Sequence, residues 1–147
     1  MKLNPDCVRA VMLCVEEHTG IEQNCYFIHY VSDDITLLIG GGNIGSPADY
    51  QIDLEKKYDN DEIFQAVKNC SDSGFFVLGI TDSANRIMVK DLTPAGHNFV
   101  ENIRTDKNWK KIQQLVLKAG ALSAGAIADI ATNVVLSQAT QALSSMK

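Results

Sequence analysis

The chain has 147 residues, of which 46% are hydrophobic and 21% are charged, and its formal net charge is −5. These values are typical of a globular domain and exclude a disordered, fibrous or disulfide-stapled chain. The charge is uneven: residues 1–91 hold 15 acidic and 7 basic side chains, which gives −8, whereas residues 92–147 hold 3 acidic and 6 basic ones, which gives +3. An acidic surface repels a phosphate backbone, so only the C-terminal part could tolerate nucleic acid.

The cysteines and the first residues predict a cytoplasmic protein without a bound metal. The four cysteines form no Cys-x-x-Cys pair, and no histidine lies at zinc-finger spacing from them. We therefore expect them to be buried thiols in a reducing compartment: Cys7, Cys14, Cys25 and Cys70. Charged residues interrupt the first seventeen positions, where an export signal needs a continuous apolar stretch. Residues 119–146 carry only Asp129 as a charge but contain many polar side chains, so we expect a soluble helix and no membrane span.

The first predicted element is a helix that begins after Asn4. Asn4 can cap this helix, Pro5 suits its first position, and Leu3 is placed to pack against Val8. Gly20 ends the segment, and apolar residues recur within it at helical spacing: Val8, Val11, Met12 and Val15.

Two β-prone runs follow, at residues 25–31 and 35–39. The Ser32-Asp33-Asp34 segment between them predicts a tight turn, and therefore an antiparallel hairpin. A short strand is predicted further along by the alternation of Tyr50, Ile52 and Leu54.

The spacing of Gly40, Gly42 and Gly45 matches the pattern G-x-G-x-x-G directly after an apolar run, as in dinucleotide-binding proteins. The context of such a site is missing, because Ser46-Pro47 and an acidic stretch follow where a long apolar helix is needed, and repeated βαβ units are not found. We therefore interpret this glycine-rich run as a loop and expect no cofactor.

A second helix is predicted after a cap at Asp59 or Asn60. Its first turn carries Asp61 and Glu62, as the helix dipole favours, and residues 71–74 stop it. Its apolar face consists of Ile63, Phe64, Val67 and Cys70.

A hairpin with a polar tip comes next, because residues 75–80 and 87–92 are both predicted as strands, and we call this hairpin the wing. Thr93 and Pro94 then start a third helix, in which Gly96 would let a neighbouring segment approach closely. The apolar face of this helix consists of Gly96, Phe99, Val100 and Ile103.

A fourth helix is predicted from about Thr105 to Lys118. Its spacing directs two sets of four residues to opposite sides: Trp109, Ile112, Val116 and Ala119 inward, and Lys107, Lys111, Gln114 and Lys118 outward. The last helix follows directly and is rich in alanine and glycine.

The order helix, short sheet, helix, hairpin, helix is that of a winged helix. We therefore predict an α+β fold in a single domain over residues 1–147, with a winged-helix-like core over about 1–104 and a helical extension over about 105–147. No long internal repeat or linker divides the chain.

The run Leu92-Thr93-Pro94-Ala95-Gly96-His97-Asn98-Phe99, with Ile103, Arg104 and Trp109, resembles the signature of a family of small phage and prophage proteins, the domain of unknown function number 2513. The opening Met1-Lys2-Leu3-Asn4-Pro5-Asp6-Cys7 is similar to the start of that family. The resemblance covers residues 1–18 and about 58–119, and it implies a fold and a phage-linked context without an activity. The chain departs from the family in a longer, more glycine-rich segment at 21–57, and in a helix before the wing that lacks the histidine and basic residues of such members.

We expect no catalytic residues and no enzyme activity. His18, His29 and His97 could pair with a cysteine nucleophile, but no flanking signature supports such a pair. His97 is expected to pack against Leu92 or to bind a carbonyl of the wing. Neighbouring carboxylates, such as Asp61 with Glu62, are interpreted as helix-start residues.

For nucleic acid, the candidate residues are Arg86, Lys90, Arg104, Lys107, Lys110, Lys111 and Lys118. The helix that a winged helix places in the major groove is acidic here, since it offers Asp61, Glu62 and Asp72 against Lys68. We therefore expect an accessory protein of phage or prophage type that binds a protein partner. The alternative is a DNA-binding transcriptional regulator.

The last helix also predicts a homodimer, because its apolar surface exceeds that of a solvent-facing helix. Small residues at Ala121, Gly125 and Ala128 would let two such helices meet across a two-fold axis. The alternative is that the helix folds back onto its own domain and covers Trp109 and Val116.

Overall fold

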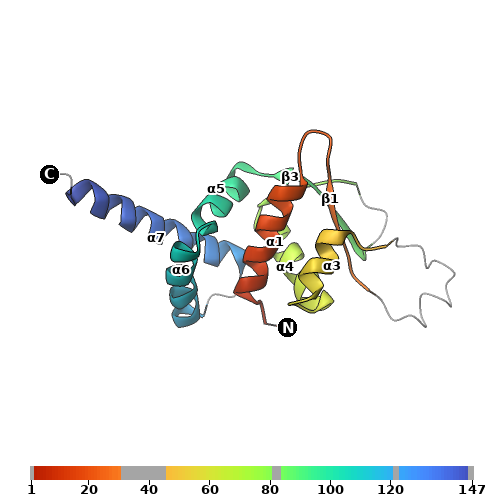
Figure 1. Ribbon diagram of the computed structural model, residues 1–147, viewed down its shortest axis with the longest axis horizontal. Coiled ribbons are helices and arrows are strands. Elements are labelled where there is room, and N and C mark those ends of the chain that lie inside the picture. The colour runs from red at the N-terminus through yellow and green to blue at the C-terminus, as the bar shows by residue number, and fades with distance from the viewer. Residues whose placement is uncertain (1, 31–45, 81–83, 121–122, 146–147) are drawn as a thin grey trace.

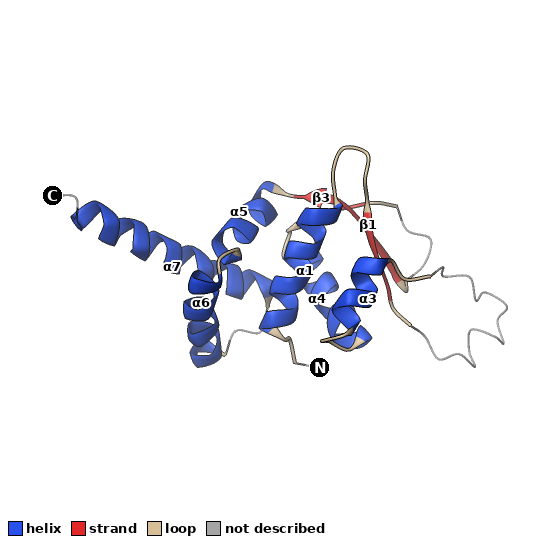
Figure 2. Cartoon of the chain, in the orientation of Figure 1, coloured by secondary structure: helices blue, strands red, loops and turns tan. Residues whose placement is uncertain are grey.

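The computed structural model describes residues 2–30, 46–80, 84–120 and 123–145. These residues form an α+β fold, as predicted (Figure 1; Figure 2). In chain order the elements are α1 (Pro5–His18), β1 (Cys25–Ile28), α3 (Asp49–Glu55), α4 (Asn60–Asp72), β2 (Phe76–Leu78), β3 (Arg86–Leu92), α5 (Pro94–Ile103), α6 (Asp106–Ala119) and α7 (Ala124–Ser145).

Helix α1 begins as predicted and lies in the middle of the fold (Figure 1). The side-chain oxygen of Asn4 accepts hydrogen bonds from the backbone N–H of Asp6 at 3.1 Å and of Cys7 at 3.4 Å, and Pro5 takes the first helical position. The helix buries one face in the core, including Val8, Val11, Met12 and Val15. Helices α4 and α5 and strand β3 all pack against it.

The three strands form an antiparallel sheet in the order β1-β3-β2. Tyr26 of β1 pairs with Met88 of β3, and Phe76 of β2 pairs with Leu92 of β3. The predicted hairpin of β2 and β3 is confirmed, although both β1 and β2 are shorter than predicted. The register of the hairpin shifts between Val77 and Leu78, which is the mark of a β-bulge.

Side chains cover the outer edge of β1. The hydroxyl of Tyr50 accepts a hydrogen bond from the N–H of Tyr26 at 2.8 Å and donates one to its carbonyl at 3.1 Å. The amide of Gln51 binds the N–H and the carbonyl of Ile28 at 2.9 and 2.8 Å. The predicted partner strand at 35–39 and the glycine-rich run at 40–45 lie outside the described residues.

The short strand predicted from Tyr50, Ile52 and Leu54 is wrong, because these residues belong to helix α3. Tyr50 and Leu54 are four residues apart, so the helix directs both of them toward the core, while Ile52 is left exposed. The same turn of helix brings Gln51, which is fully buried, against β1. Alternating apolar residues in so short a segment do not separate a strand from a helix.

Helices α4, α5 and α6 begin close to the predicted positions. Asp61 and Glu62 lie in the first turn of α4, and the Glu62 carboxylate accepts a hydrogen bond from the N–H of Asp59 at 3.3 Å. Thr105 caps α6, and Gly120 ends it in the left-handed conformation with φ 65°. Trp109, Ile112 and Val116 are buried as predicted, but Ala119 is exposed because it lies in the last turn, where it borders an open hollow with Ile130 of α7.

Helix α7 has two differently packed halves. Its first half contacts α4, α5 and α6 and buries Ala124, Ile127, Ala131 and Val134. Its second half projects away from the other elements (Figure 1), and Leu136 and Leu143 are 58% and 66% exposed there. The alternative that the last helix folds back onto its own domain thus describes the first half.

Candidate interaction surfaces

The residues of the Leu92–Phe99 motif and their companions mostly belong to the core. Leu92, Phe99, Ile103 and Trp109 are each no more than 5% exposed. The hydroxyl of Thr93 accepts a hydrogen bond from the N–H of Gly96 at 3.1 Å and donates one to the carbonyl of Gly74 at 2.6 Å. This part of the motif therefore joins the start of α5 to the segment that leaves α4.

Gly96 allows the close approach that we predicted. A Cβ atom at this position would overlap the backbone carbonyl oxygen of Phe75 and would lie 3.3 Å from the Cβ of Leu92. That same carbonyl accepts a hydrogen bond from the N–H of Thr93 at 3.0 Å, so the backbone around it cannot move aside freely. Only glycine fits here without displacing this contact.

Trp109 and Arg104 attach the C-terminal helices to α1. The indole N–H of Trp109 donates to the Asp6 carboxylate at 2.9 Å, and the Gln113 amide donates to the same carboxylate. Arg104 forms ion pairs with Glu16 at 2.6 Å and Glu101 at 2.7 Å. These bonds raise the pKa of Arg104, and its charge is already balanced by two carboxylates.

Arg9 anchors the same region, although no local pattern in the sequence points to it. Its guanidinium donates to the carbonyl oxygens of Ile103 and Arg104 at 2.9 and 3.0 Å and pairs with Asp106 at 3.0 Å. It also lies over the ring of Trp109, with 5.5 Å between its Cζ and the ring centroid. One side chain of α1 thus donates hydrogen bonds to the carbonyl groups at the end of α5 and forms an ion pair at the start of α6.

His97 makes a different contact from the two that we predicted. Its ring is exposed, and its Nε2 lies 3.7 Å from the carboxylate of Asp91 in β3. The helical turn after Thr93 points the ring along the wing strand, where a carboxylate is within reach.

Cys14 and His18 do not have the arrangement of a nucleophile and its base. The Nδ1 of His18 lies 2.9 Å from the carbonyl oxygen of Cys14 and 3.9 Å from its Sγ. A hydrogen bond with Cys25 and burial raise the pKa of Cys14, while the same bond and that of Tyr50 lower the pKa of Cys25. A raised pKa disfavours the thiolate that nucleophilic catalysis needs.

The predicted buried thiols are confirmed, since all four cysteines are buried and unpaired. Over residues 2–30, 46–80, 84–120 and 123–145, no three His, Cys, Asp or Glu side chains are grouped closely enough to hold a metal ion. In the same ranges, no helix combines the length and apolar character needed to cross a bilayer.

The basic candidates fall into two separate groups. The lysines of α6 are all exposed: Lys107, Lys110, Lys111 and Lys118. Lys90 is exposed on β3, whereas Arg86 lies over the ring of Tyr26, with 4.6 Å between its Cζ and the ring centroid. The structure therefore gathers the free basic charge on α6 rather than on the wing.

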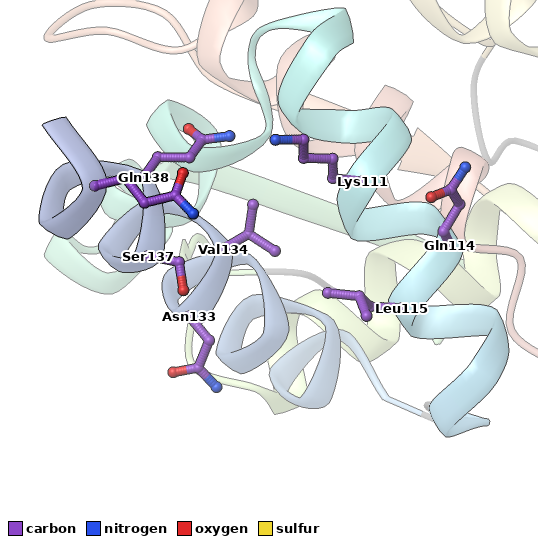
Figure 3. A pocket seen from close by; sticks show the side chains of 8 residues that line it. Lys111, Gln114, Leu115, Asn133, Val134, Ser137 and Gln138 are labelled. Atoms are coloured by element: carbon purple, nitrogen blue, oxygen red, sulfur yellow. The ribbon is translucent and has the colours of Figure 1, made fainter. Parts of the chain in front are cut away.

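A groove runs between α6 and α7, and sequence reasoning missed it. Figure 3 shows Lys111 and Leu115 of α6 and Val134 of α7 around this space, and its volume is about 350 Å³. The other five side chains of its lining are neutral amides and one hydroxyl: Gln114, Asn133, Ser137, Gln138 and Gln141. The run of uncharged polar residues in α7 was the only signal for it in the sequence.

Helix α4 offers little basic surface. Asp61, Lys68 and Asp72 are its exposed charged residues, and Asp61 pairs with His29 at 2.7 Å. The C-terminal end of α4 is covered by the start of α7, because Asn69 accepts a hydrogen bond from the N–H of Ala124 at 2.6 Å. The acidic character predicted for this helix is therefore carried by its accessible face.

Two of the predicted dimer-seam residues lie against their own chain. The N–H of Gly125 donates to the Ser73 hydroxyl at 3.1 Å, and a Cβ at Gly125 would lie 3.6 Å from that hydroxyl oxygen. Ala128 packs against the hydrophobic core. Ala121 lies outside the described residues.

The wing carries exposed apolar side chains. Val77 and Leu78 of β2 are 44% and 47% exposed, and Ile80, just after the strand, is 96% exposed. The bulge between Val77 and Leu78 contributes to this exposure, because it interrupts the alternation that would turn every second side chain inward. Among the described strands, β2 is an edge of the sheet.

The family model described as "Hypothetical protein (DUF2513)" matches residues 2–122. This range includes α1 to α6 and ends before α7. No curated protein and no solved structure matches the chain. Because the match covers far more than half of the sequence, the chain belongs to the DUF2513 family.

Proposed function

We propose that this protein is a non-enzymatic accessory protein of phage or prophage type that binds a protein partner through a winged-helix-like scaffold. The observation that carries the proposal is the contrast between the two edges of the sheet. The outer edge of β1 is covered by side chains of α3, whereas β2 has no strand beside it among the described residues and carries Val77, Leu78 and nearby Ile80 in exposed positions. An extended segment of a partner protein can pair with an exposed strand edge as an additional strand, and apolar side chains beside the edge give it further contacts.

The order of the elements supports the winged-helix part of the proposal. A helix, a strand, two helices and a β-hairpin follow one another, and β1 pairs with the second strand of the hairpin. In a DNA-reading winged helix, the helix before the hairpin is basic and open to the major groove. Here α4 presents Asp61 and Asp72, which repel phosphates and leave the scaffold suited to a protein surface.

The experiment compares three baits in host lysate: the wild-type chain, the double variant Leu78→Asp/Ile80→Asp, and the control Leu117→Asp. Leu117 is also an exposed leucine, at 71%, but it lies on α6. We expect the wild type and the control to retain the same partner and the wing variant to lose it. Retention of that partner by the wing variant, or repeated failure of the wild type to capture any protein, would contradict the proposal.

The four exposed lysines of α6 favour a second candidate, a DNA-binding regulator. If α6 contacts phosphates, affinity for duplex DNA falls steeply with salt, and Lys107→Glu/Lys111→Glu weakens binding to all sequences alike. The control is Lys68→Glu, an exposed lysine of α4. A gel-shift titration at low salt decides this candidate, because a chain that shifts no duplex there does not use α6 on DNA.

A further inference from the structure

We infer that the projecting half of α7 is the contact between two copies of this chain, paired antiparallel. This inference goes beyond the proposed function and concerns a different surface from the wing. It moves the dimer contact away from Gly125 and Ala128, which lie against their own domain, to the exposed leucines of the projecting half, Leu136 and Leu143.

The projecting half has little packing of its own. Residues 136–145 extend beyond the packed part of α7, and nearly all of their side chains are exposed. The packed first half already nucleates this helix, but most helical stability in proteins comes from packing along one face. Packing along one face supplies what the segment lacks.

One face of this segment has the spacing of a coiled-coil seam. Thr132, Leu136, Ala139 and Leu143 follow one another at intervals of four, three and four residues. They lie on the side of α7 opposite to the groove residues Ser137 and Gln141. The seam and the groove are therefore separate surfaces of the same helix.

The seam is complementary to itself rather than to a charged partner. A two-fold axis beside Ala139 brings Leu136 of one copy next to Leu143 of the other, with small side chains at the centre where the helices approach most closely. Residues 130–146 contain no charged side chain, so two copies meet without like-charge repulsion. Charged side chains are one means by which helices select between partners, and this segment has none.

The first test is the mass of the chain by sedimentation equilibrium over about 10 to 500 µM, a range that covers a weak, short interface. We expect a reversible monomer–dimer equilibrium in the wild type. Leu136→Asp/Leu143→Asp raises the dissociation constant at least about tenfold, and Leu117→Asp leaves it unchanged. A monomer mass at every concentration, or a dimer that the double variant does not weaken, overturns the inference.

The second test fixes the orientation by disulfide cross-linking under mild oxidation. The four native cysteines are buried, so single added cysteines report the contact. Ala139→Cys cross-links to itself, and a mixture of Leu136→Cys and Leu143→Cys gives the mixed dimer in preference to either self-dimer. The control Gln141→Cys, on the groove side, does not cross-link. Preferred self-dimers of Leu136→Cys would indicate a parallel pair and would exclude this geometry.

Discussion

The side-chain amide of Gln51 binds the backbone N–H and carbonyl of Ile28 in the position that a neighbouring strand would take. Gln51 is fully buried, and it is joined at the Ile28 carbonyl by the Asn60 amide, which donates a second hydrogen bond there at 2.9 Å. Together with the hydroxyl of Tyr50 on Tyr26, this arrangement closes one edge of the sheet with a helix.

Gln51→Leu is expected to lower the free energy of unfolding by about 1–3 kcal/mol, because it leaves the buried N–H of Ile28 without a partner, while the Ile28 carbonyl keeps its hydrogen bond from the Asn60 amide. Urea denaturation followed by circular dichroism measures the loss. Gln114→Leu, on the exposed face of α6, serves as the control and should change stability by less than about 0.5 kcal/mol. Equal effects of the two substitutions would contradict the role assigned to Gln51.

Gly96→Ala is expected to destabilise the chain by about 2–4 kcal/mol, since the added methyl group overlaps the carbonyl of Phe75 and forces the start of α5 away from the sheet. The matched substitution is Gly125→Ala, where the nearest atom would be 3.6 Å from the new Cβ. Thermal or urea unfolding should place Gly125→Ala within about 1 kcal/mol of the wild type. If Gly96→Ala is tolerated equally well, the close contact at Phe75 does not exist in solution.

The bond between Trp109 and Asp6 is expected to stabilise the contact of α6 with α1 by about 1–2 kcal/mol. A double-mutant cycle with Trp109→Phe and Asp6→Ala measures this coupling. Circular dichroism is the readout, because Trp109 is the only tryptophan and its fluorescence disappears in the variant. A coupling energy near zero would show that the two side chains act independently.

Stability is expected to fall as the pH rises above about 9. Burial raises the pKa of the Cys7 thiol from its ordinary value of 9.0 to about 12 and raises that of Cys70 as well. The unfolded chain therefore releases these protons at a pH where the folded chain retains them, and each such thiol lowers the free energy of unfolding by up to about 1.4 kcal/mol per pH unit. Urea denaturation at pH 8 and pH 10 measures the effect.

Cys7→Ala is the comparison for this pH dependence. The variant should lose less stability than the wild type between pH 8 and pH 10, by about 1 kcal/mol. Equal losses in the two proteins would mean that Cys7 ionises as easily in the folded chain as in the unfolded one.

Local signals predicted most of the helices. Asn4 with Pro5, Thr93 with Pro94, and Thr105 each combine a capping side chain with a following apolar face, and these determinants lie within a few residues of each other. The space needed at Gly96 was also predicted, because a glycine in the apolar face of a helix often marks a position where a neighbouring backbone leaves no room for a side chain. Such features depend on residues close together in the chain.

The features that the sequence did not reveal depend on contacts between distant segments. Helix α3 is stabilised by the bonds of Tyr50 and Gln51 to β1, which lies 23 or more residues earlier in the chain. Arg104 was a candidate for phosphate binding because its pairing with Glu16, 88 residues away, has no local trace. The groove between α6 and α7 exists only where the two helices diverge, and helical periodicity does not predict that angle.

The start of α7 depends on the end of α4 for its hydrogen bonds. Asn69 and Ser73 accept the N–H groups of Ala124 and Gly125, which every free helix start exposes to water. The first turn of α7 is therefore tied to a helix that ends about fifty residues earlier, so local opening of α4 also frees these two N–H groups. Amide hydrogen exchange of the dilute monomer should follow this dependence: protons in the first turns of α7 exchange together with those of α4, and protection declines from there toward Ser145.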